Sequence, residues 1–196
     1  MRKPAASARA PAEGARAFFA AADAPERRAL YLSPVGPLEL ACRGGALTCL
    51  DFNARAGAIP AAAPGRDRGL DAARRWLDAY FAGENPDARA LALAPAGSVF
   101  QCAVWEILRE IPYGAVTTYG AVAREAARRL GRTRMAAQAA GGAIGRNPIG
   151  IIIPCHRVIG ADGALTGFGG GLAVKTQLLR GEGVHLPPAE FFIWEN

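Results

Sequence analysis

A cysteine and a histidine stand side by side in the segment IIIPCHRVIG, residues 151–160. A thiol becomes a nucleophile when it loses its proton, and a nearby imidazole can take that proton. Adjacent side chains point to different sides of a strand or helix, so a direct hydrogen bond between Cys155 and His156 is awkward. A bridging water fits better, and the second imidazole nitrogen then needs an orienting carboxylate. Glu182, in a glycine-rich turn, is a candidate for that carboxylate.

The same pair of residues allows two other interpretations. A free cysteine is most often a buried apolar side chain, which would make Cys155 inert. A cysteine beside a histidine also serves hydrolases such as cysteine proteases and thioesterases. The second histidine of the chain, His185, lies near the C-terminus before two prolines and lacks the usual partners of a protease site. The pattern by itself leaves a reactive thiol, an inert thiol and a hydrolase open.

Composition narrows the class of protein. The chain has 196 residues and a formal net charge of +6, which favours an anionic partner such as nucleic acid. Its four cysteines contain no CxxC pair and there are only two histidines, so we expect no metal site and no disulfide framework. Free thiols indicate a reducing, cytoplasmic compartment. No apolar run approaches the roughly 20 residues of a membrane span.

The N-terminal part of the chain predicts a tail followed by an α/β domain. Residues 1–28, rich in alanine, arginine and proline, predict a disordered basic tail, with an organellar transit segment as the alternative. Residues 29–94 form the α/β domain, with three short strands of an antiparallel sheet over 29–53 and an Ala/Gly/Pro loop over 54–66. A helix follows over 66–84, and its apolar face consists of Leu70, Ala73, Leu77, Tyr80 and Phe81.

Residues 95–196 predict a mostly α-helical second domain. Ser98 and Gln101 have the spacing of a capping box, and an apolar helical pattern runs on to residue 111. Thr117 or Thr118 is placed to cap a second helix that ends near Gly131. Thr133 is placed to cap a third helix over 134–145, and the last two helices then form a helix-turn-helix with a short turn.

The segment around the cysteine predicts a short strand between loops. Residues 149–153 are apolar and rich in β-branched side chains, which favours a short buried strand beside the Cys-His pair. A glycine-rich loop over 160–171 follows, and residues 172–183 predict a last short helix. The strand and the loop would therefore enclose the cysteine.

The predicted helix-turn-helix has two features suited to DNA. It carries five arginines against one acid, Glu125, and this excess fits phosphate contacts, although a solvated face is an alternative. These arginines are Arg124, Arg128, Arg129, Arg132 and Arg134. The second helix is nearly all small residues, which suits close packing in a core or entry into a narrow minor groove. In the groove, Gln138 is the long side chain placed to reach the base stack.

Longer motifs then resemble a known family. The motif IPCHRV (153–158), with GRNP (145–148) before it and GGLAVK (170–175) after it, resembles the O6-alkylguanine-DNA alkyltransferases, also called methylated-DNA–protein-cysteine methyltransferases. The resemblance continues through FQCAVWEILREIPYG and TTYGAVA and covers the C-terminal half tightly. The N-terminal half matches only in style, through the hairpin SPVGPLEL.

The resemblance implies both a fold and an activity. The fold is an α/β domain followed by a mostly α domain with the helix-turn-helix and the cysteine. The activity is repair of duplex DNA, approached from the minor groove, in which a damaged guanine is flipped out and its O6-alkyl group moves to the cysteine. Each molecule reacts once, without metal or cofactor, as a monomer that can cluster on DNA. O4-alkylthymine is a second candidate substrate, on which the sequence does not decide.

The resemblance also implies roles for individual residues. Cys155 would accept the alkyl group, His156 would act on it through a water, and Glu182 would orient His156. Asn147 would brace the tight turn beside the site, and Tyr119 would lie by the flipped nucleotide and give a proton to the departing guanine. The residues expected to contact DNA or substrate are Tyr119, Arg134, Ala137, Gln138, Gly141, Arg157, Val158, Phe168 and Gly169.

Several positions depart from the family pattern. Gln138 stands where the family usually has an arginine finger, and Phe168 replaces a frequent tyrosine. Gly150 replaces a proline found in some members, and Thr166 replaces a glycine. We expect bulky O6-benzyl substrates to fit less well than methyl. The alternatives to repair are a damage-binding or regulatory DNA-binding protein without transfer, and a Cys-His hydrolase.

Overall fold

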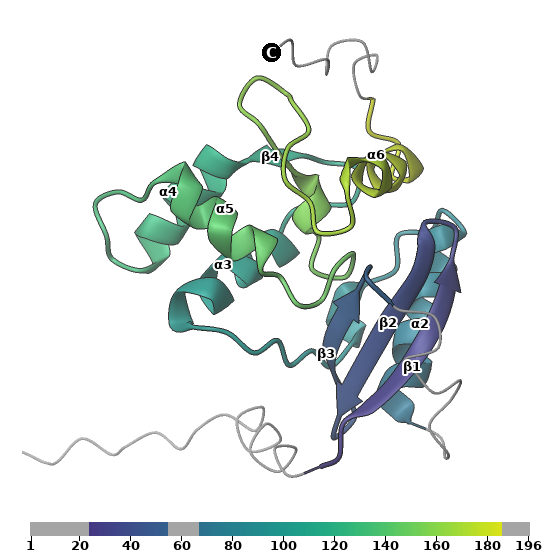
Figure 1. Cartoon of the computed structure of the whole chain (residues 1–196). Helices are drawn as coiled ribbons and strands as arrows, with labels where there is room; N and C mark the ends of the chain where they lie inside the picture. The colour runs from purple at the N-terminus through teal and green to yellow at the C-terminus, as the bar shows by residue number, and fades with distance from the viewer. Residues whose placement is uncertain (1–23, 55–66, 186–196) are drawn as a thin grey trace, which may run out of the picture.

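The computed structural model describes residues 24–54 and 67–185. Most of two predicted segments lies outside the described residues: residues 1–23 of the tail over 1–28, and residues 55–66 of the loop over 54–66. The remaining chain folds into two units that share one hydrophobic core. In Figure 1 a three-stranded sheet backed by a helix lies beside a cluster of short helices.

The N-terminal unit is the predicted antiparallel sheet with a helix on one face. Its strands β1 (Arg27–Ser33), β2 (Gly36–Arg43) and β3 (Ala46–Asp51) pair in the order β1-β2-β3. Helix α2 (Arg68–Phe81) packs on the sheet, and the Asp67 side chain caps it by accepting hydrogen bonds from the backbone at Gly69 and Leu70. The predicted strands and helix are confirmed, and the short helix η1 (Ala88–Ala90) leads into the second unit.

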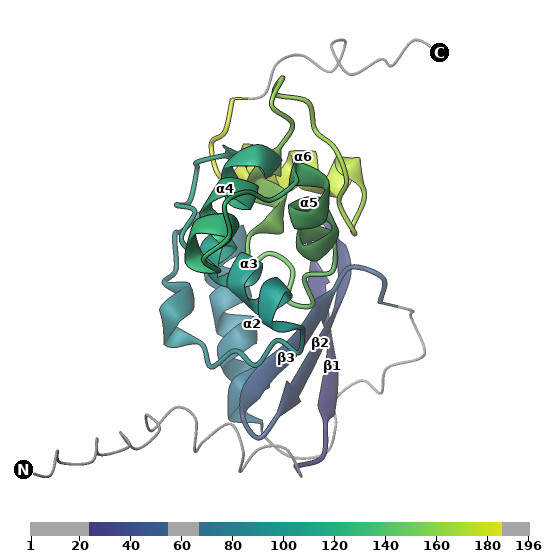
Figure 2. The same ribbon diagram turned by 90° about the vertical axis from the view of Figure 1, so that its left-hand side faces the viewer.

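Three helices of the C-terminal unit pack against one another. They are α3 (Val99–Arg109), α4 (Tyr119–Arg129) and α5 (Ala137–Gly145), and Figure 2 shows α4 and α5 side by side, with α3 below them. The predicted capping box at the start of α3 is confirmed, with both reciprocal hydrogen bonds of Ser98 and Gln101 present. Thr118 caps α4 by accepting a hydrogen bond from the backbone of Ala121, 3.2 Å away.

The predicted cap of α5 is wrong. Thr133 does not cap the helix: the N-cap is Ala136, and no side chain accepts a hydrogen bond there. The reason lies at the end of α4, where Gly131 adopts a positive φ of 63° and the backbone N–H of Arg132 bonds back to Ala127, 2.8 Å away. Residues 130–136 therefore form the connection between α4 and α5, which is longer than predicted.

The predicted strand over 149–153 is also wrong. These residues form a tight, buried turn in which Ile152 N bonds to Gly150 O and Ile153 N bonds to Ile149 O. Ile151 takes a positive φ of 63°, in the left-handed region and outside the β region that a strand of L-residues needs. The short buried strand near the cysteine is β5 (Val158–Ile159), which pairs in parallel with β4 (Thr117–Thr118).

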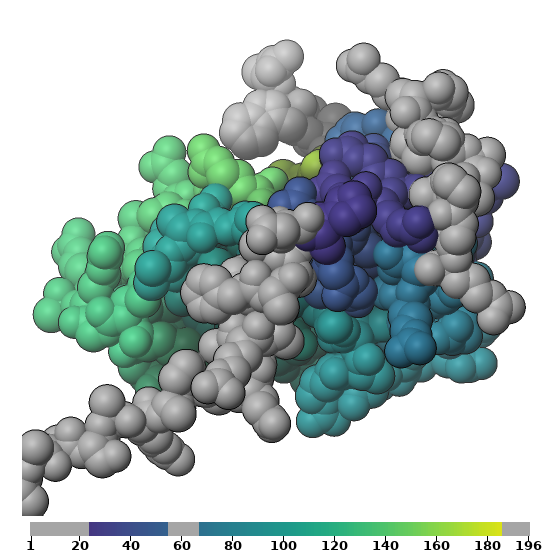
Figure 3. All heavy atoms as spheres, turned by 90° about the horizontal axis from the view of Figure 1, so that it is seen from below, coloured from purple at the N-terminus to yellow at the C-terminus, as the bar shows by residue number. Residues whose placement is uncertain are grey.

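The last helix, α6 (Leu172–Gly181), follows the glycine-rich loop and confirms the prediction there. From below, the green helices of the C-terminal unit and the purple strands of the N-terminal unit lie on opposite sides of the molecule (Figure 3). Within the described ranges, none of the helices has the length and apolar character needed to cross a bilayer.

Candidate active site

Cys155 begins the short helix η2 (Cys155–Arg157), directly after the buried turn. Its thiol is half-buried and faces a pocket of about 340 Å³. Both units line this pocket: Phe52 and Asn53 follow β3, Asn147 precedes the turn, and Phe168 and Gly169 belong to the glycine-rich loop. The sequence therefore brings a thiol to the floor of a concave site at the junction of the two units.

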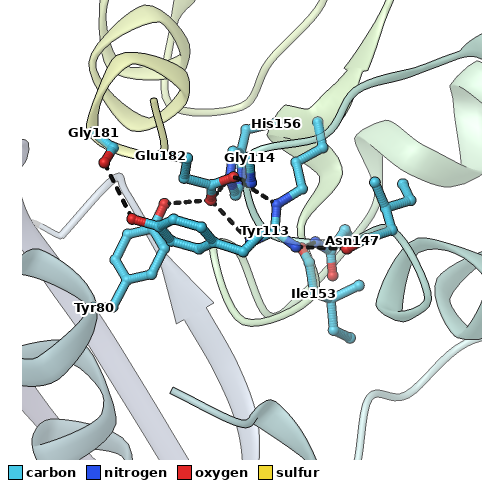
Figure 4. A network of polar contacts seen from close by, with 10 residues as sticks. Tyr80, Tyr113, Gly114, Asn147, Ile153, His156, Gly181 and Glu182 are labelled. Atoms are coloured by element: carbon cyan, nitrogen blue, oxygen red, sulfur yellow. Dashed lines mark hydrogen bonds and ion pairs between the residues drawn. The ribbon is translucent and has the colours of Figure 1, made fainter. Parts of the chain in front are cut away.

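Asn147 supports the turn that carries the cysteine. Its Nδ2 donates to the carbonyl of Ile153 at 2.7 Å and to that of Ile149 at 3.4 Å, and its Oδ1 accepts from Ile149 N at 3.1 Å. Figure 4 shows Asn147 pointing at Ile153, across the turn. These side-chain bonds replace the strand ladder that β-branched residues would otherwise favour, and they stabilise the left-handed conformation of Ile151.

The structure brings His156 and Glu182 together, although they lie 26 positions apart in sequence. Both side chains are fully buried, and His156 Nε2 lies 2.7 Å from Glu182 Oε1. A carboxylate accepts hydrogen bonds only, so this contact assigns the proton to Nε2. His156 Nδ1 is buried and has no hydrogen-bond partner among the residues that the structure describes. Nδ1 is therefore left as an acceptor inside the site.

Glu182 is the centre of a polar network, which Figure 4 shows from close by. Besides His156, it accepts hydrogen bonds from Arg157 Nε and Nη2, at 2.8 and 2.9 Å, from Tyr80 Oη at 2.8 Å and from Gly114 N at 3.2 Å. Burial raises the pKa of Glu182, but the hydrogen bonds from His156 and Arg157 outweigh burial and hold that pKa at about 2. The residue is an anion that orients its partners.

Arg157 differs from its expected place at the DNA. Its guanidinium is buried against Glu182, and its Nη1 donates to the Ile111 carbonyl at 2.7 Å. The guanidinium also lies over the ring of Tyr113, 5.7 Å from its centroid. These partners fix Arg157 as a neighbour of the buried carboxylate, and its side chain is about 10% exposed.

Tyr80 and Lys175 also belong to this site, although the sequence predicted no role there for either residue. The apolar pattern of α2 assigns Tyr80 to the core, and only the fold brings its hydroxyl to Glu182. Lys175 is fully buried, and its Nζ donates to the carbonyls of Val158 at 2.6 Å and Thr166 at 2.8 Å. A lysine within the apolar pattern of α6 is the one sequence signal for it, because buried lysines are rare unless they have partners.

Burial and its neighbours act on the thiol in opposite directions. Burial raises the pKa of Cys155, while a hydrogen bond from Asn147 and the charge of Lys175 lower it. Burial also lowers the pKa of Lys175 to about 8, against the attraction of Cys155. Burial lowers the pKa of His156, so its imidazole is neutral at pH 7. The site thus holds a protonated thiol whose ionisation is assisted by specific neighbours.

The glycine-rich loop closes over one side of the pocket. The Tyr119 hydroxyl donates to the Thr166 carbonyl at 2.9 Å and lies 3.3 Å from that of Gly167. Phe168 is half-buried and faces the ring of Phe52 edge-on, with centroids 5.1 Å apart. Tyr119 and Lys175 thus hold the loop from below, and the exposed Gly169 lies at the pocket rim.

The helix-turn-helix presents the residues expected to meet DNA. Arg134, Ala137 and Gln138 are exposed, and a Cβ on the half-buried Gly141 would lie 3.5 Å from the ring of Tyr119. Two of the five arginines are engaged elsewhere: Arg128 and Arg129 pair with Glu125, and Arg129 also pairs with Glu110 of the α3 C-terminus. In the part of the chain that the structure covers, Arg124, Arg132 and Arg134 form no ion pair.

The described residues contain no group of three or more His, Cys, Asp or Glu side chains that could hold a metal ion. All four cysteines are free thiols. The reactive and charged side chains gathered at this site are a cysteine, a histidine–carboxylate pair and a buried lysine.

Comparisons with known proteins agree with this geometry. The DNA-binding domain of 6-O-methylguanine DNA methyltransferase matches residues 99–184, and the ribonuclease-like domain of the same enzyme matches residues 27–95. The methylated-DNA–protein-cysteine methyltransferase of Methanosarcina acetivorans is 43% identical over 79% of this chain and 97% of its own length. That of Haemophilus influenzae is 43% identical over 76% of this chain and 82% of its own length.

A solved structure, Mycobacterium tuberculosis OGT in complex with DNA, has a TM-score of 0.65 and 42% identity, covering 80% of this chain and 92% of that one. Both units of the chain are thus matched, by sequence and by fold. The chain therefore belongs to the 6-O-methylguanine-DNA methyltransferase family.

Proposed function

We propose that this protein repairs O6-alkylguanine in duplex DNA by moving the alkyl group to the sulfur of Cys155, each molecule reacting once. The observation that carries the proposal is the half-buried Cys155 thiol on the floor of a 340 Å³ pocket, beside a buried His156–Glu182 pair. Relatives of this chain are named methylated-DNA–protein-cysteine methyltransferases, and a DNA complex of a similar structure supports DNA as the partner.

The transfer is a substitution at the carbon attached to O6. The thiolate of Cys155 attacks that carbon, a carbon–sulfur bond forms, and the carbon–oxygen bond breaks with its electron pair going to O6. The guanine then takes a proton and leaves as the repaired base. A thiolate displaced from the thioether would be a poorer leaving group than the guanine, so the alkyl group stays on the sulfur and the protein is consumed. The substitution changes no oxidation state, so it needs no oxidant or reductant, and it uses no metal.

The histidine supplies the base for this step. Glu182 holds the proton of His156 on Nε2, which leaves the buried Nδ1 free to accept one. A water between Nδ1 and the Cys155 sulfur would carry the thiol proton to the imidazole. The negative charge of Glu182 favours the imidazolium that results, as the orienting acid does in catalytic triads.

Tyr119 is the proton donor we propose for the departing guanine. Its hydroxyl lies at the glycine-rich loop, next to Thr166 and Gly167, on the side of the pocket where α4 begins. When substrate enters, the Tyr119 hydroxyl would exchange its hydrogen bond to the Thr166 carbonyl for one to the purine. The backbone at Cys155, Val158 and Gly169 would hold the base edges, which a flipped nucleotide exposes.

We propose that α4 and α5 bind the minor groove of DNA, as a monomer, in the cytoplasm. The exposed small residues of α5 allow the backbone to approach a narrow groove closely, and Gln138 is the side chain placed to fill the gap left by the flipped base. Arg134, exposed beside them, suits a phosphate contact. Free thiols throughout the chain suit a reducing compartment.

The proposal is tested by mass. The protein is incubated with a duplex that carries a single O6-methylguanine, and its intact mass and peptide map are measured. We expect a gain of one methylene, on Cys155, that saturates at one per molecule. A Cys155→Ser variant should bind the duplex and gain nothing, whereas Cys102→Ser, whose half-buried thiol does not line the pocket, should react normally.

Two results contradict the proposal. If the wild-type protein binds the duplex but never gains mass, it recognises DNA without repairing it. If Cys155→Ser is methylated as fast as the wild type, another residue accepts the alkyl group.

A further inference from the structure

The end of strand β3 is hydrogen-bonded to the turn that carries the cysteine. Leu50 N donates to the Pro148 carbonyl at 2.9 Å, and Gly150 N donates to the Leu50 carbonyl at 3.0 Å. Leu50 is buried, so this bridge lies in the core between the two units. It fixes where the following residues of the N-terminal unit emerge, which is at the pocket of Cys155.

Phe52 is the residue that this bridge delivers to the pocket. Its ring fills the space above two glycines, since a Cβ on Gly150 would lie 2.5 Å from Phe52 Cε2 and a Cβ on Gly170 would lie 2.8 Å from Phe52 Cγ. Its ring also meets Phe168 edge-on, at 5.1 Å between centroids and an interplanar angle of 61°. One aromatic ring therefore spans the distance between the active-site turn and the glycine-rich loop.

The backbone on both sides of Phe52 is fixed. On one side Leu50 bonds to the turn. On the other side the Asp51 carboxylate accepts hydrogen bonds from both the backbone and the side chain of Asn53, each at 2.9 Å. The ring packs against Phe168 and lies directly beside Gly150 of the turn and Gly170 of the loop.

We propose that Phe52 is a specificity-determining residue that limits the size of the O6 substituent the pocket accepts. The inference rests on the proposed function and adds to it the substrate class, guanines with small O6-alkyl groups. A methyl group needs only to reach the sulfur. A benzyl group must also find room for its ring beyond the reacting carbon, between the turn and the loop, where the Phe52 ring already packs.

The volume of the site supports this assignment. The pocket of about 340 Å³ lies at the lower end of the range for sites that enclose a drug-sized ligand, about 300–1,000 Å³. The flipped guanine must share that space with its alkyl group. Gly150 contributes no side chain, and Phe52 and Phe168 are the two aromatic side chains among the residues that line the pocket. Removing the ring of Phe52 enlarges the site without touching Cys155, His156 or Glu182.

The test compares single-turnover transfer rates from two duplexes, one with O6-methylguanine and one with O6-benzylguanine. The variants are Phe52→Leu and Phe52→Ala, with Phe100→Ala as control, because Phe100 is a half-buried phenylalanine on α3 that does not line the pocket. We expect the benzyl-to-methyl rate ratio to rise from wild type to Leu to Ala, by about 10-fold or more in the alanine variant, as for removal of apolar groups from specificity pockets. Phe100→Ala should leave the ratio unchanged.

The outcomes separate the two proposals. If the wild type transfers neither group although its fold and DNA binding are intact, the proposed function fails. If methyl transfer proceeds but the ratio stays constant in both Phe52 variants, or falls, the assignment of Phe52 is wrong. Should Phe52→Ala fail to fold by circular dichroism, Phe52→Leu decides alone, because it keeps an apolar side chain on the two glycines.

Discussion

The hydroxyl of Tyr80 donates a 2.8 Å hydrogen bond to Glu182 Oε1, and the two residues lie 102 positions apart in the chain. Tyr80 belongs to α2 of the N-terminal unit, whereas Glu182 follows α6 at the end of the C-terminal unit. The same carboxylate oxygen faces His156 Nε2 (Figure 4). The N-terminal unit thus helps to hold the carboxylate that orients the histidine of the site, in addition to packing against it.

We predict that Tyr80→Phe slows alkyl transfer and lowers stability. The change removes a hydrogen bond to a buried charge, which is worth about 1.5–3 kcal/mol. Glu182 keeps Arg157 and His156 as partners, so the fold should survive. Urea unfolding measures the loss of stability, and single-turnover rates between pH 6 and 9 measure transfer. A rate deficit at equal DNA affinity would identify Tyr80 as a positioning residue.

Tyr31→Phe is the matched control for this variant. Tyr31 is also in the N-terminal unit, and its hydroxyl bonds to a carboxylate, Asp78, at 2.9 Å, away from the site. This variant should lose some stability and keep the transfer rate of the wild type. Equal rate deficits in Tyr80→Phe and Tyr31→Phe would mean that the contact with Glu182 has no special role.

Stability should decline in acid because of Glu182. Its pKa is about 2 in the folded protein against a usual value of 4.5, so its contribution is complete above about pH 5 and disappears as the pH falls through 4.5 towards 2. A shift of this size corresponds to about 3 kcal/mol, at 1.36 kcal/mol per pH unit. We predict that Glu182→Gln is strongly destabilised at pH 7, since Arg157 and His156 lose their buried partner.

Urea unfolding of both proteins at pH 7 and pH 3 checks this prediction. The difference in free energy of unfolding between wild type and Glu182→Gln should be largest at pH 7 and should shrink by about 2 kcal/mol at pH 3. Other carboxylates, such as Glu125, are present in both proteins, so their titration cancels in the difference. A difference that is the same at both pH values would contradict the assigned charge state of Glu182.

Asn147→Ala should destabilise the turn and weaken the thiol as a nucleophile. The variant leaves the backbone N–H of Ile149 without its partner, at about 1–3 kcal/mol for a buried group. It also removes one of the two hydrogen bonds to the Ile153 carbonyl, which keeps Cys155 N as a donor. The hydrogen bond from Asn147 also lowers the pKa of Cys155 against the effect of burial. Without it that pKa rises further, so the thiol should react more slowly at pH 7 and recover part of the deficit at higher pH.

The rate of Cys155 alkylation by iodoacetamide, followed from pH 6 to 10, measures this effect. Asn53→Ala is the control, because Asn53 also lines the pocket but bonds only to Asp51 among the described residues. Its pH profile should match that of the wild type. Identical profiles for Asn147→Ala and the wild type would remove Asn147 from any role at the thiol.

The sequence predicted the parts of this fold whose signals are local. The capping box of α3 and the Thr118 cap of α4 depend on residues a few positions apart, and both are present. Propensity failed over 149–153, because the side chain of Asn147 supplies the hydrogen bonds that a strand partner would have given. The cap at Thr133 failed because the turn that ends α4 runs on through Arg132, and α5 begins only at Ala137.

The site could be predicted only in part, because some of its residues come from distant parts of the chain. Cys155 and His156 are adjacent, and the family motif points to Glu182, so this part follows from the sequence. Tyr80 and Phe52 belong to the other unit, and each fits its local pattern as an ordinary apolar residue of a helix face or a strand end. Only the bridge between Leu50 and the turn brings Phe52 to the pocket of Cys155, and only the packing of α2 brings Tyr80 to Glu182.

Gln138 provides a separate test of the DNA-binding face. Its side chain is exposed on the first turn of α5, where we propose that it fills the gap left by the flipped base. Gln138→Ala should reduce transfer from duplex DNA by about 10-fold or more, since the gap is left empty, and it should leave the reaction with free O6-methylguanine base unchanged. Gln138→Arg should bind DNA more tightly and increase the salt dependence of binding by about one phosphate contact.

Single-turnover rates with the duplex and with the free base separate flipping from chemistry, and binding titrations at several salt concentrations measure the added contact. Thr133→Ala is a suitable control, because Thr133 is exposed in the connection before α5 and does not cap the helix. It should match the wild type with both substrates. If Gln138→Ala instead loses the same factor with duplex and free base, then Gln138 acts on the pocket rather than on the DNA, and the groove-facing orientation of α5 is wrong.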